Sequence, residues 1–326
     1  GTPFIQTLTF FFFPYEDEAI AAYRRGDVMA IGNVTPRERD RAEKRKSVTY
    51  ALHIPKYFAV FFNISKSKPL VDKNVRMALA AATDKNDMIQ KVLGGNGVPI
   101  DSSIFPWMAG YNEKVVQREF SIERAKEILE QGGWKDGDGD GIREKTIAGD
   151  KEPTPLEIAL ATSDFPDLVQ AAELLKASWE QLGARIRLDI RDVEELKQRT
   201  IKPRFFEALL FGEALTLTPD LYFFWHSSQK KDPGLNLSLF DHKEVDRLLE
   251  SVRESLNPEE RMGNLQKVQE IISEELPVLF LYSPFYLFIV DRDVKNITVS
   301  VINIPARRFS GIEEWYIKTK RIEKTH

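Results

Sequence analysis

The chain has 326 residues, 42% hydrophobic and 29% charged, a balance typical of a globular protein with room for about two domains. A formal net charge of −4 argues against a nucleic-acid-binding protein, which normally carries a basic face. The absence of cysteine excludes disulfides, thiol nucleophiles and cysteine-based metal sites, and no apolar run approaches the ~18 residues that a membrane span needs.

The N-terminal part of the chain alternates between patterns that predict strands and helices. Residues 5–13 are apolar and aromatic and predict a strand. Residues 15–25 predict a helix, because an acidic first turn and a basic last turn suit the helix dipole. Residues 28–31 predict a short strand, and the aromatic run at 58–62 predicts a buried one.

The rest of the chain continues this alternation. Two helices are expected between Asp72, which stands at an N-cap position, and Gly95, which ends the second helix. Asn257 followed by Pro258 is another strong helix start. Further helices are predicted at 121–129 and 166–182, and further strands at 185–190, 205–211, 278–282, 286–290 and 296–301. Strands alternating with helices indicate an α/β fold.

Three groups of residues, in this order, carry a family resemblance. The first group is Phe62-Asn63, Pro69, Asp72, Val75-Arg76, Ala78-Leu79, Asp84-Lys85 and Ile89. The second is Gly132-Gly133-Trp134 with the acidic glycine-rich loop 136–141. The third is 244–249 with Glu260-Arg261 and Glu275-Leu276-Pro277. Together they resemble the family 5 extracellular solute-binding proteins, bacterial receptors of ABC importers for oligopeptides, dipeptides, nickel and some oligosaccharides.

The resemblance implies an α/β fold like that of the type II periplasmic binding proteins of cluster C, with one complete lobe plus part of a second. Residues 1–55 would be part of the first lobe (domain I-like), 56–285 the second lobe (domain III-like), and 286–326 the return to the first lobe. Family members carry a signal peptide and a further half before the region that resembles residue 1 onward. We therefore expect the C-terminal half only, with the N-terminal half missing.

The resemblance also implies a function. The complete protein would bind a peptide or other small solute in an interlobe cleft and deliver it to the permease subunits of an ABC transporter. It would act in the periplasm or outside the cell, with any lipid anchor on an N-terminal segment absent here. The expected partners are thus a small-molecule or peptide ligand, the permease and the missing half, with no nucleic acid.

The segment from Phe211 to Asn236 is the expected ligand region. Family members commonly have a Gly-Trp here and then an aspartate shortly before a proline; in peptide binders this aspartate holds the α-ammonium group. Alignment on Pro219 places Leu215 at the aspartate position. A leucine cannot pair a buried ammonium. Either the solute lacks a free cationic end, or Glu213 or Asp220 replaces the aspartate.

Other expected ligand contacts are aromatic walls and polar amides. Rigid aromatic side chains bury a large area at low entropic cost, although core packing is the alternative for each of them. Two asparagines match family positions in the cleft. The complete set of expected ligand contacts is Asn63, Trp107, Phe211, Gly212, Glu213, Leu215, Asp220, Trp225, Asn236 and Tyr282.

An acidic loop is a candidate calcium site. Asp136, Asp138 and Asp140 fit the first half of a calcium loop, in which alternate oxygens converge on one ion. Ile147 stands where the bidentate glutamate is needed, so Glu144 could serve only with a different geometry. The alternative is a polar turn capped by its own aspartates. Apart from this calcium ion, no cofactor is expected.

Two other functional classes stay open. Similar folds serve as ligand-sensing domains of signalling or transcription-regulatory proteins. An enzyme, such as a calcium-dependent hydrolase, is a third hypothesis. However, the sequence has no Gly-x-Ser-x-Gly elbow, Walker loop or dinucleotide motif, and its histidines do not pair at metal-ligand spacing; they are His53, His226, His242 and His326. Since nothing argues for catalysis, we predict a binding protein.

Overall fold

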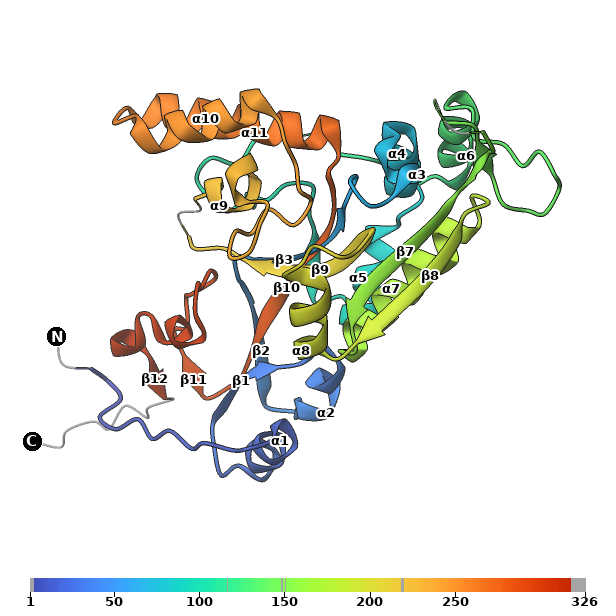
Figure 1. Cartoon of the computed structure of the whole chain (residues 1–326). Coiled ribbons are helices and arrows are strands. Elements are labelled where there is room, and N and C mark those ends of the chain that lie inside the picture. The colour runs from blue at the N-terminus through green and yellow to red at the C-terminus, as the bar shows by residue number, and fades with distance from the viewer. Residues whose placement is uncertain (1–2, 116, 148, 150, 218–219, 318–326) are drawn as a thin grey trace, which may run out of the picture. The chain divides into compact units, whose positions relative to one another are not determined.

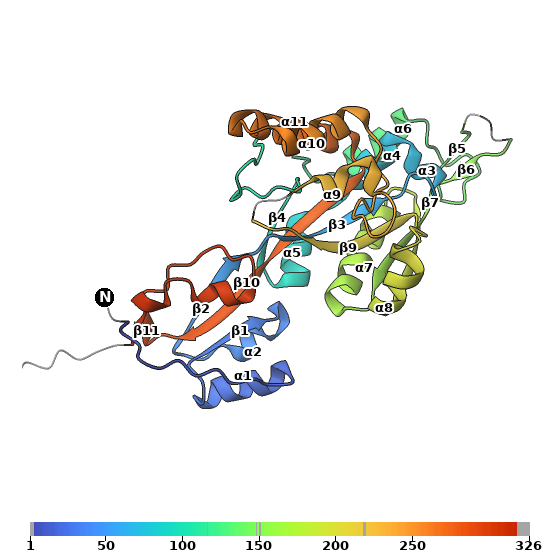
Figure 2. The ribbon, with the colours of Figure 1, turned by 60° about the vertical axis from the view of Figure 1, so that its left-hand side comes forward.

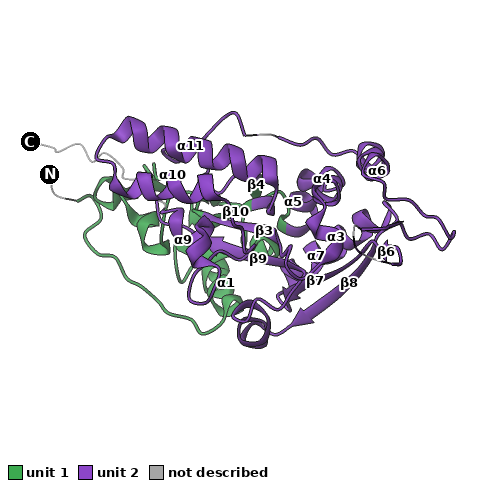
Figure 3. Cartoon of the chain, turned by 45° about the horizontal axis from the view of Figure 1, so that its top comes forward, with its two compact units in different colours: residues 1–55, 93–98, 283–326 green, residues 56–92, 99–282 purple. Residues whose placement is uncertain are grey.

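The computed structural model describes residues 3–115, 117–147, 149, 151–217 and 220–317 (Figure 1). Within this description the chain divides into two compact units (Figure 3). Unit 1 comprises Gly1–Pro55, Leu93–Val98 and Ser283–His326, and unit 2 comprises Lys56–Val92 and Pro99–Tyr282. No helix among the described residues is long and apolar enough to cross a membrane.

Unit 1 is built on strands that pair antiparallel with the C-terminal part of β10 (Val278–Asp291), namely β1 (Ala30–Val34) and β2 (Ser47–His53). The predicted helix is α1 (Glu16–Arg25), which Gly26 ends in the left-handed conformation. Shorter elements complete the unit: η1 (Pro36–Glu38), α2 (Arg39–Ala42), β4 (Gly97–Pro99), β11 (Val294–Lys295), η4 (Pro305–Phe309), η5 (Ile312–Glu314) and β12 (Tyr316–Ile317).

Two strand predictions in unit 1 are wrong. Residues 5–13 pair with no strand, and Phe10, Phe11 and Phe12 are exposed. The segment instead lines a hollow of about 690 Å³ together with β1 and β10. Residues 296–301 form only an isolated bridge, between His53 and Val301. Apolar content alone cannot make a strand, because the backbone also needs a partner edge.

The units differ in two short segments from the lobes expected from the sequence. Residues 93–98 and 283–285 group with unit 1 instead of the 56–285 lobe. The physical reason is local pairing: β4 pairs with β10, and Phe285 N donates a hydrogen bond to Asn96 O. The assignment of these units to the lobes of a complete receptor stays a prediction.

Unit 2 contains a mixed sheet in the order β10-β3-β9-β7-β8. The strand β3 (Lys56–Phe62) pairs antiparallel with β10 on one side and with β9 (Ala208–Ala214) on the other. The strand β7 (Glu157–Ser163) is parallel to both β9 and β8 (Arg185–Arg191). The helix α7 (Pro166–Glu180) provides the crossover between β7 and β8, as parallel strands require.

The other helices of unit 2 follow the predicted order. The antiparallel pair α10 (Lys243–Glu254) and α11 (Pro258–Glu275) lies side by side (Figures 1 and 2). The remaining elements are α3 (Lys68–Val71), α4 (Lys73–Ala81), α5 (Lys85–Leu93), α6 (Ile122–Gln131), α8 (Val193–Glu195), the π-helical η2 (Leu196–Ile201), α9 (Tyr222–Trp225), η3 (Ser227–Gln229), β5 (Glu144–Lys145) and β6 (Thr154–Pro155).

Residues of the family resemblance hold unit 2 together. Asp72 caps α4 by accepting from Asn74 N, and it also accepts from Trp134 Nε1 at 3.0 Å, which confirms the N-cap prediction. Arg76 is buried and donates to the carbonyl oxygens of Leu70, Val71, Glu275 and Leu276. This guanidinium therefore clamps the N-terminal end of α4 to the C-terminal end of α11.

Candidate functional site

The pairing of β3 with β9 divides the expected ligand residues between two faces of the sheet. Tyr57 lies opposite Glu213, Phe58 opposite Gly212, and Lys56 opposite Ala214. Successive side chains of a strand point to opposite faces. Glu213 and Gly212 consequently serve different surfaces of unit 2.

On the first face, Glu213 is a buried carboxyl group. Its Oε2 accepts a hydrogen bond from the Tyr57 hydroxyl, and its Oε1 has no hydrogen-bond partner among the described residues. Burial raises the pKa of Glu213 to about 8, an effect that the Tyr57 hydrogen bond and the more distant Arg204 charge only partly offset. The carboxyl is therefore mainly protonated, and neutral, at pH 7.

Four other expected ligand residues belong to, or pack against, the apolar cluster that contains Tyr57. Leu215 and Trp225 are buried in it, and Phe211 and Trp107 pack against it. The Trp107 ring stacks on Phe105 with centroids 4.7 Å apart. The structure thus brings these residues together with Glu213, but as packed side chains. Pro219, on which the alignment rests, lies outside the described residues.

The opposite face carries an aromatic pair and a lysine. The Phe58 ring lies 5.5 Å from the Tyr282 ring, and a Cβ at Gly212 would stand only 2.7 Å from Phe58, so glycine allows this close approach. Lys56 Nζ lies 4.9 Å from the Phe58 ring centroid. No carboxylate of the described residues pairs with Lys56, which is half-buried, and burial lowers its pKa.

Sequence reasoning missed Lys56. The signal that could have found it is a single cation at the start of the apolar strand 56–62. A half-buried ammonium beside an aromatic ring can receive an anionic or polar group through a charge-assisted hydrogen bond. Lys56 and Phe58, which are partly exposed, are therefore the residues of unit 2 whose chemistry best suits contact with a solute, whereas the expected contact Tyr282 is buried beside Phe58.

The two predicted asparagine contacts are fully engaged within the chain. Asn63 Nδ2 donates to Arg204 O, and its Oδ1 accepts from Ser65 N. Asn236 donates to Phe240 O at 2.8 Å and accepts from Phe240 N at 2.9 Å. Both side chains are completely buried. They shape the surrounding loops, and their contact with a solute stays a prediction.

Asp220 is held by a cation of the same unit. Its carboxylate accepts from Arg253 Nη2 at 2.6 Å and from Arg253 Nε at 3.1 Å, and Tyr222 N donates to it. The guanidinium also lies 3.7 Å from the Tyr222 ring centroid. The negative charge of Asp220 is therefore already compensated within the chain.

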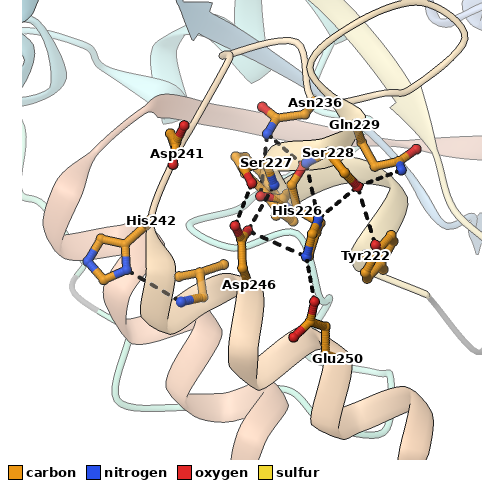
Figure 4. Close-up of polar contacts among 12 residues, drawn as sticks. Tyr222, His226, Ser227, Ser228, Gln229, Asn236, Asp241, His242, Asp246 and Glu250 are labelled. Carbon is orange, nitrogen blue, oxygen red and sulfur yellow. Dashed lines mark hydrogen bonds and ion pairs between the residues drawn. The ribbon is translucent and has the colours of Figure 1, made fainter.

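His226 joins the ligand region to α10 (Figure 4). Its Nδ1 accepts from Ser228 N at 3.1 Å, and its ring stacks on Tyr222 with centroids 4.1 Å apart. Its Nε2 lies 3.4 Å from Glu250 Oε1 and 3.9 Å from Asp246 Oδ1. These contacts give His226 a structural role at the start of η3. His326 lies outside the described residues.

The acidic loop gathers three of the four predicted calcium ligands. Carboxylate oxygens of Asp136, Asp138 and Glu144 lie within 4.8 Å of one another. Asp140 is not in this group; Ile142 N donates to its Oδ1, and Arg185 lies 3.6 Å from its Oδ2. Backbone amides also occupy Asp136 and Glu144, as in the alternative of a self-capped polar turn. Calcium binding stays a prediction.

Comparison with solved structures defines the class of protein. The oligopeptide-binding protein AppA of Bacillus subtilis, solved with a nonapeptide, matches 94% of this chain and 59% of its own, with a TM-score of 0.74 and 25% identity. NikZ of Campylobacter jejuni, solved with Ni(L-His), matches 92% of this chain and 59% of its own, with a TM-score of 0.73 and 20% identity. The fold is thus that of the type II periplasmic binding proteins, as predicted.

The family follows from the sequence match. The family model "Bacterial extracellular solute-binding proteins, family 5 Middle" matches residues 1–243, and the chain belongs to this family. The B. subtilis AppA sequence is 26% identical over 97% of this chain, and the dipeptide-binding protein of Escherichia coli is 24% identical over 91%. The chain spans 57% and 53% of these relatives, respectively. The relatives are binding proteins, and they give the signalling alternative no support.

Proposed function

We propose that the protein is an extracytoplasmic solute-binding receptor of an ABC importer, to which this chain contributes one complete lobe and part of another. The observation that carries the proposal is the family match over residues 1–243. In the complete receptor, a hinge motion would close the lobes on the solute and present the closed form to the permease. The permease and the further polypeptide that completes the cleft belong to the proposal.

Three residues support a solute that offers no free ammonium group to the 211–236 segment. Leu215 is apolar, Arg253 compensates Asp220, and Glu213 is mainly neutral at pH 7 because its pKa is raised to about 8. An ammonium placed there would lose its hydration without gaining a ready counter-charge. We infer an uncharged or acidic solute, or a peptide whose ammonium group lies elsewhere, with Lys56 as its charged contact.

A thermal-shift series tests both solute binding and the proposed preference for solutes without a free ammonium group. Matched peptides with a free or an acetylated amino end, uncharged oligosaccharides and nickel chelates are added to the chain. A ligand at 100 times its Kd stabilises the folded state by about 2.7 kcal/mol. We expect acetylated peptides or oligosaccharides to raise the Tm more than free-amine peptides. A shift limited to free-amine peptides, and abolished by Glu213→Gln, would instead assign the ammonium to Glu213.

Lysine variants provide the matched control. If Lys56 is the charged contact, ligands that end in a carboxylate should raise the Tm more than matched ligands that end in an amide. Lys56→Gln should remove this difference. Lys66→Gln should leave it intact, because Lys66 also lies over a phenylalanine, at 5.8 Å from the Phe205 ring, but is exposed. No shift with any of these solutes would contradict solute binding by this chain.

A further inference from the structure

A large apolar hollow lies within unit 1, and none of the expected solute contacts lines it. Its volume of about 690 Å³ is on the scale of a binding site. The segment 5–13 forms one part of its wall, and β1, the C-terminal part of β10, Phe309 and Trp315 contribute to the rest. Aromatic side chains therefore come from several segments that are far apart in the sequence.

The segment 5–13 has the composition of a strand but no strand beside it. It is rich in isoleucine, threonine and phenylalanine, which favour strands. It runs as a coil ahead of α1 (Figure 1), and its backbone amides and carbonyls have no hydrogen-bond partner among the described residues. Unpaired backbone of this kind is a template on which another strand can pair.

The side chains of this segment are unusually exposed for their type. Phe10, Phe11 and Phe12 have exposed fractions of 53%, 59% and 94%. The Phe10 ring packs edge-on against Phe309, with centroids 5.4 Å apart, so the segment contacts the rest of unit 1 at this point. Contiguous exposed aromatic side chains mark surfaces that another protein segment covers.

A buried indole adds a second, independent observation. Trp315 lines the hollow and is 4% exposed, and its Nε1 has no hydrogen-bond partner among the described residues. Its ring packs against Phe288 and Phe309, with centroids 6.1 and 6.0 Å apart. A buried indole N–H normally has an acceptor. The occupant of the hollow should therefore bring a hydrogen-bond acceptor as well as apolar groups.

We propose that the hollow is where further polypeptide of the complete receptor docks, by adding a β-strand to the backbone of 5–13 and placing apolar side chains in the hollow. The inference rests on the proposed function, and the chain spans only 57% and 53% of two binding-protein relatives. A small apolar molecule would fill the hollow but leave the backbone of 5–13 unpaired. A strand satisfies this backbone, and its carbonyl or polar groups can accept from Trp315 Nε1.

Hydrogen exchange compares this chain with the complete receptor, both without solute. The amides of 5–13 should exchange at least about 100-fold more slowly in the complete receptor, because paired strand amides exchange only after the pairing opens. The amides of β2 provide the internal control, since β2 is already paired with β10 in this chain and should be protected in both proteins. Equally fast exchange of 5–13 in both proteins would overturn the proposal.

Single prolines test the strand pairing itself. Leu8→Pro and Thr9→Pro remove neighbouring amides, which point to opposite sides of a strand. Neither variant should change the Tm of this chain, because neither amide is bonded in it. At least one of them should lower the Tm of the complete receptor. The same Tm for both variants and wild-type receptor would contradict pairing at 5–13.

Two further outcomes separate the alternatives. A stable dimer of this chain alone, with 5–13 as protected as in the complete receptor, would assign the added strand to a second copy and overturn the proposal. Solute binding is read separately, from thermal shifts of the same complete receptor. Slow exchange at 5–13 without any solute shift would overturn the proposed function and leave this pairing standing, whereas a solute shift with fast exchange would overturn only the pairing.

Discussion

Replacing Glu213 by glutamine tests whether the buried carboxyl of the ligand region is neutral. Glutamine has nearly the same shape as a protonated glutamic acid and can still accept from the Tyr57 hydroxyl. Below pH 4.5 the wild-type side chain is protonated in both folded and unfolded states, so the two proteins should have similar stability. At higher pH they should diverge, because only the wild-type carboxyl can ionise.

The sign and size of the divergence follow from the raised pKa. The pKa of Glu213 is about 8 in the folded chain against an ordinary 4.5, so the unfolded chain releases its proton first. The free energy of unfolding therefore falls as the pH rises from 4.5 to 8, by ~1.4 kcal/mol per pH unit at most. The full loss is about 5 kcal/mol, and structural relaxation around the charge would reduce it toward ~2 kcal/mol.

Urea denaturation of both proteins at pH 5 and at pH 8.5 measures this difference. Relative to the wild type, the free energy of unfolding of Glu213→Gln should be higher at pH 8.5 than at pH 5 by ~2–5 kcal/mol. Tyr57→Phe is the matched control: it removes the hydrogen bond that lowers the pKa of Glu213, so its stability should keep falling to higher pH than that of the wild type. Parallel pH profiles for wild type and Glu213→Gln would refute the reasoning.

Three further predictions concern the Arg76 clamp between α4 and α11 and two polar side chains of the ligand region. Arg76→Lys should lower the free energy of unfolding by ~2–4 kcal/mol, because an ammonium cannot reach all four carbonyls of the clamp; a loss below ~1 kcal/mol in urea would contradict this role. Asn236→Ala should cost ~2–3 kcal/mol by leaving the buried Phe240 amide and carbonyl unpaired, and an unchanged Tm would show that another group replaces it. Asp220→Asn should cost less than ~1 kcal/mol, since its ion pair is largely exposed, and should leave solute affinity unchanged; a large loss of affinity by calorimetry would return Asp220 to the binding site.

Local patterns in the sequence were enough for much of the fold. The cap at Asp72 and the Asn257-Pro258 start are confirmed, because a capping side chain bonds to amides only two or three residues away. The strand β3 and the family membership were also predicted. All of these depend on residues close together in the chain, or on their order along it.

Burial and pairing between distant segments were decided only by the tertiary structure. The segment 5–13 has the composition of a strand, yet the described chain gives it no partner edge. Asp140 shares the spacing of Asp136 and Asp138, but Arg185 from β8 lies beside it. In the sequence, Glu213 is an available anion. In the folded chain, burial makes it mainly neutral at pH 7, and its hydrogen-bond donor Tyr57 comes from 156 residues away. Charge state depends on the medium around a group, and that medium is assembled by folding.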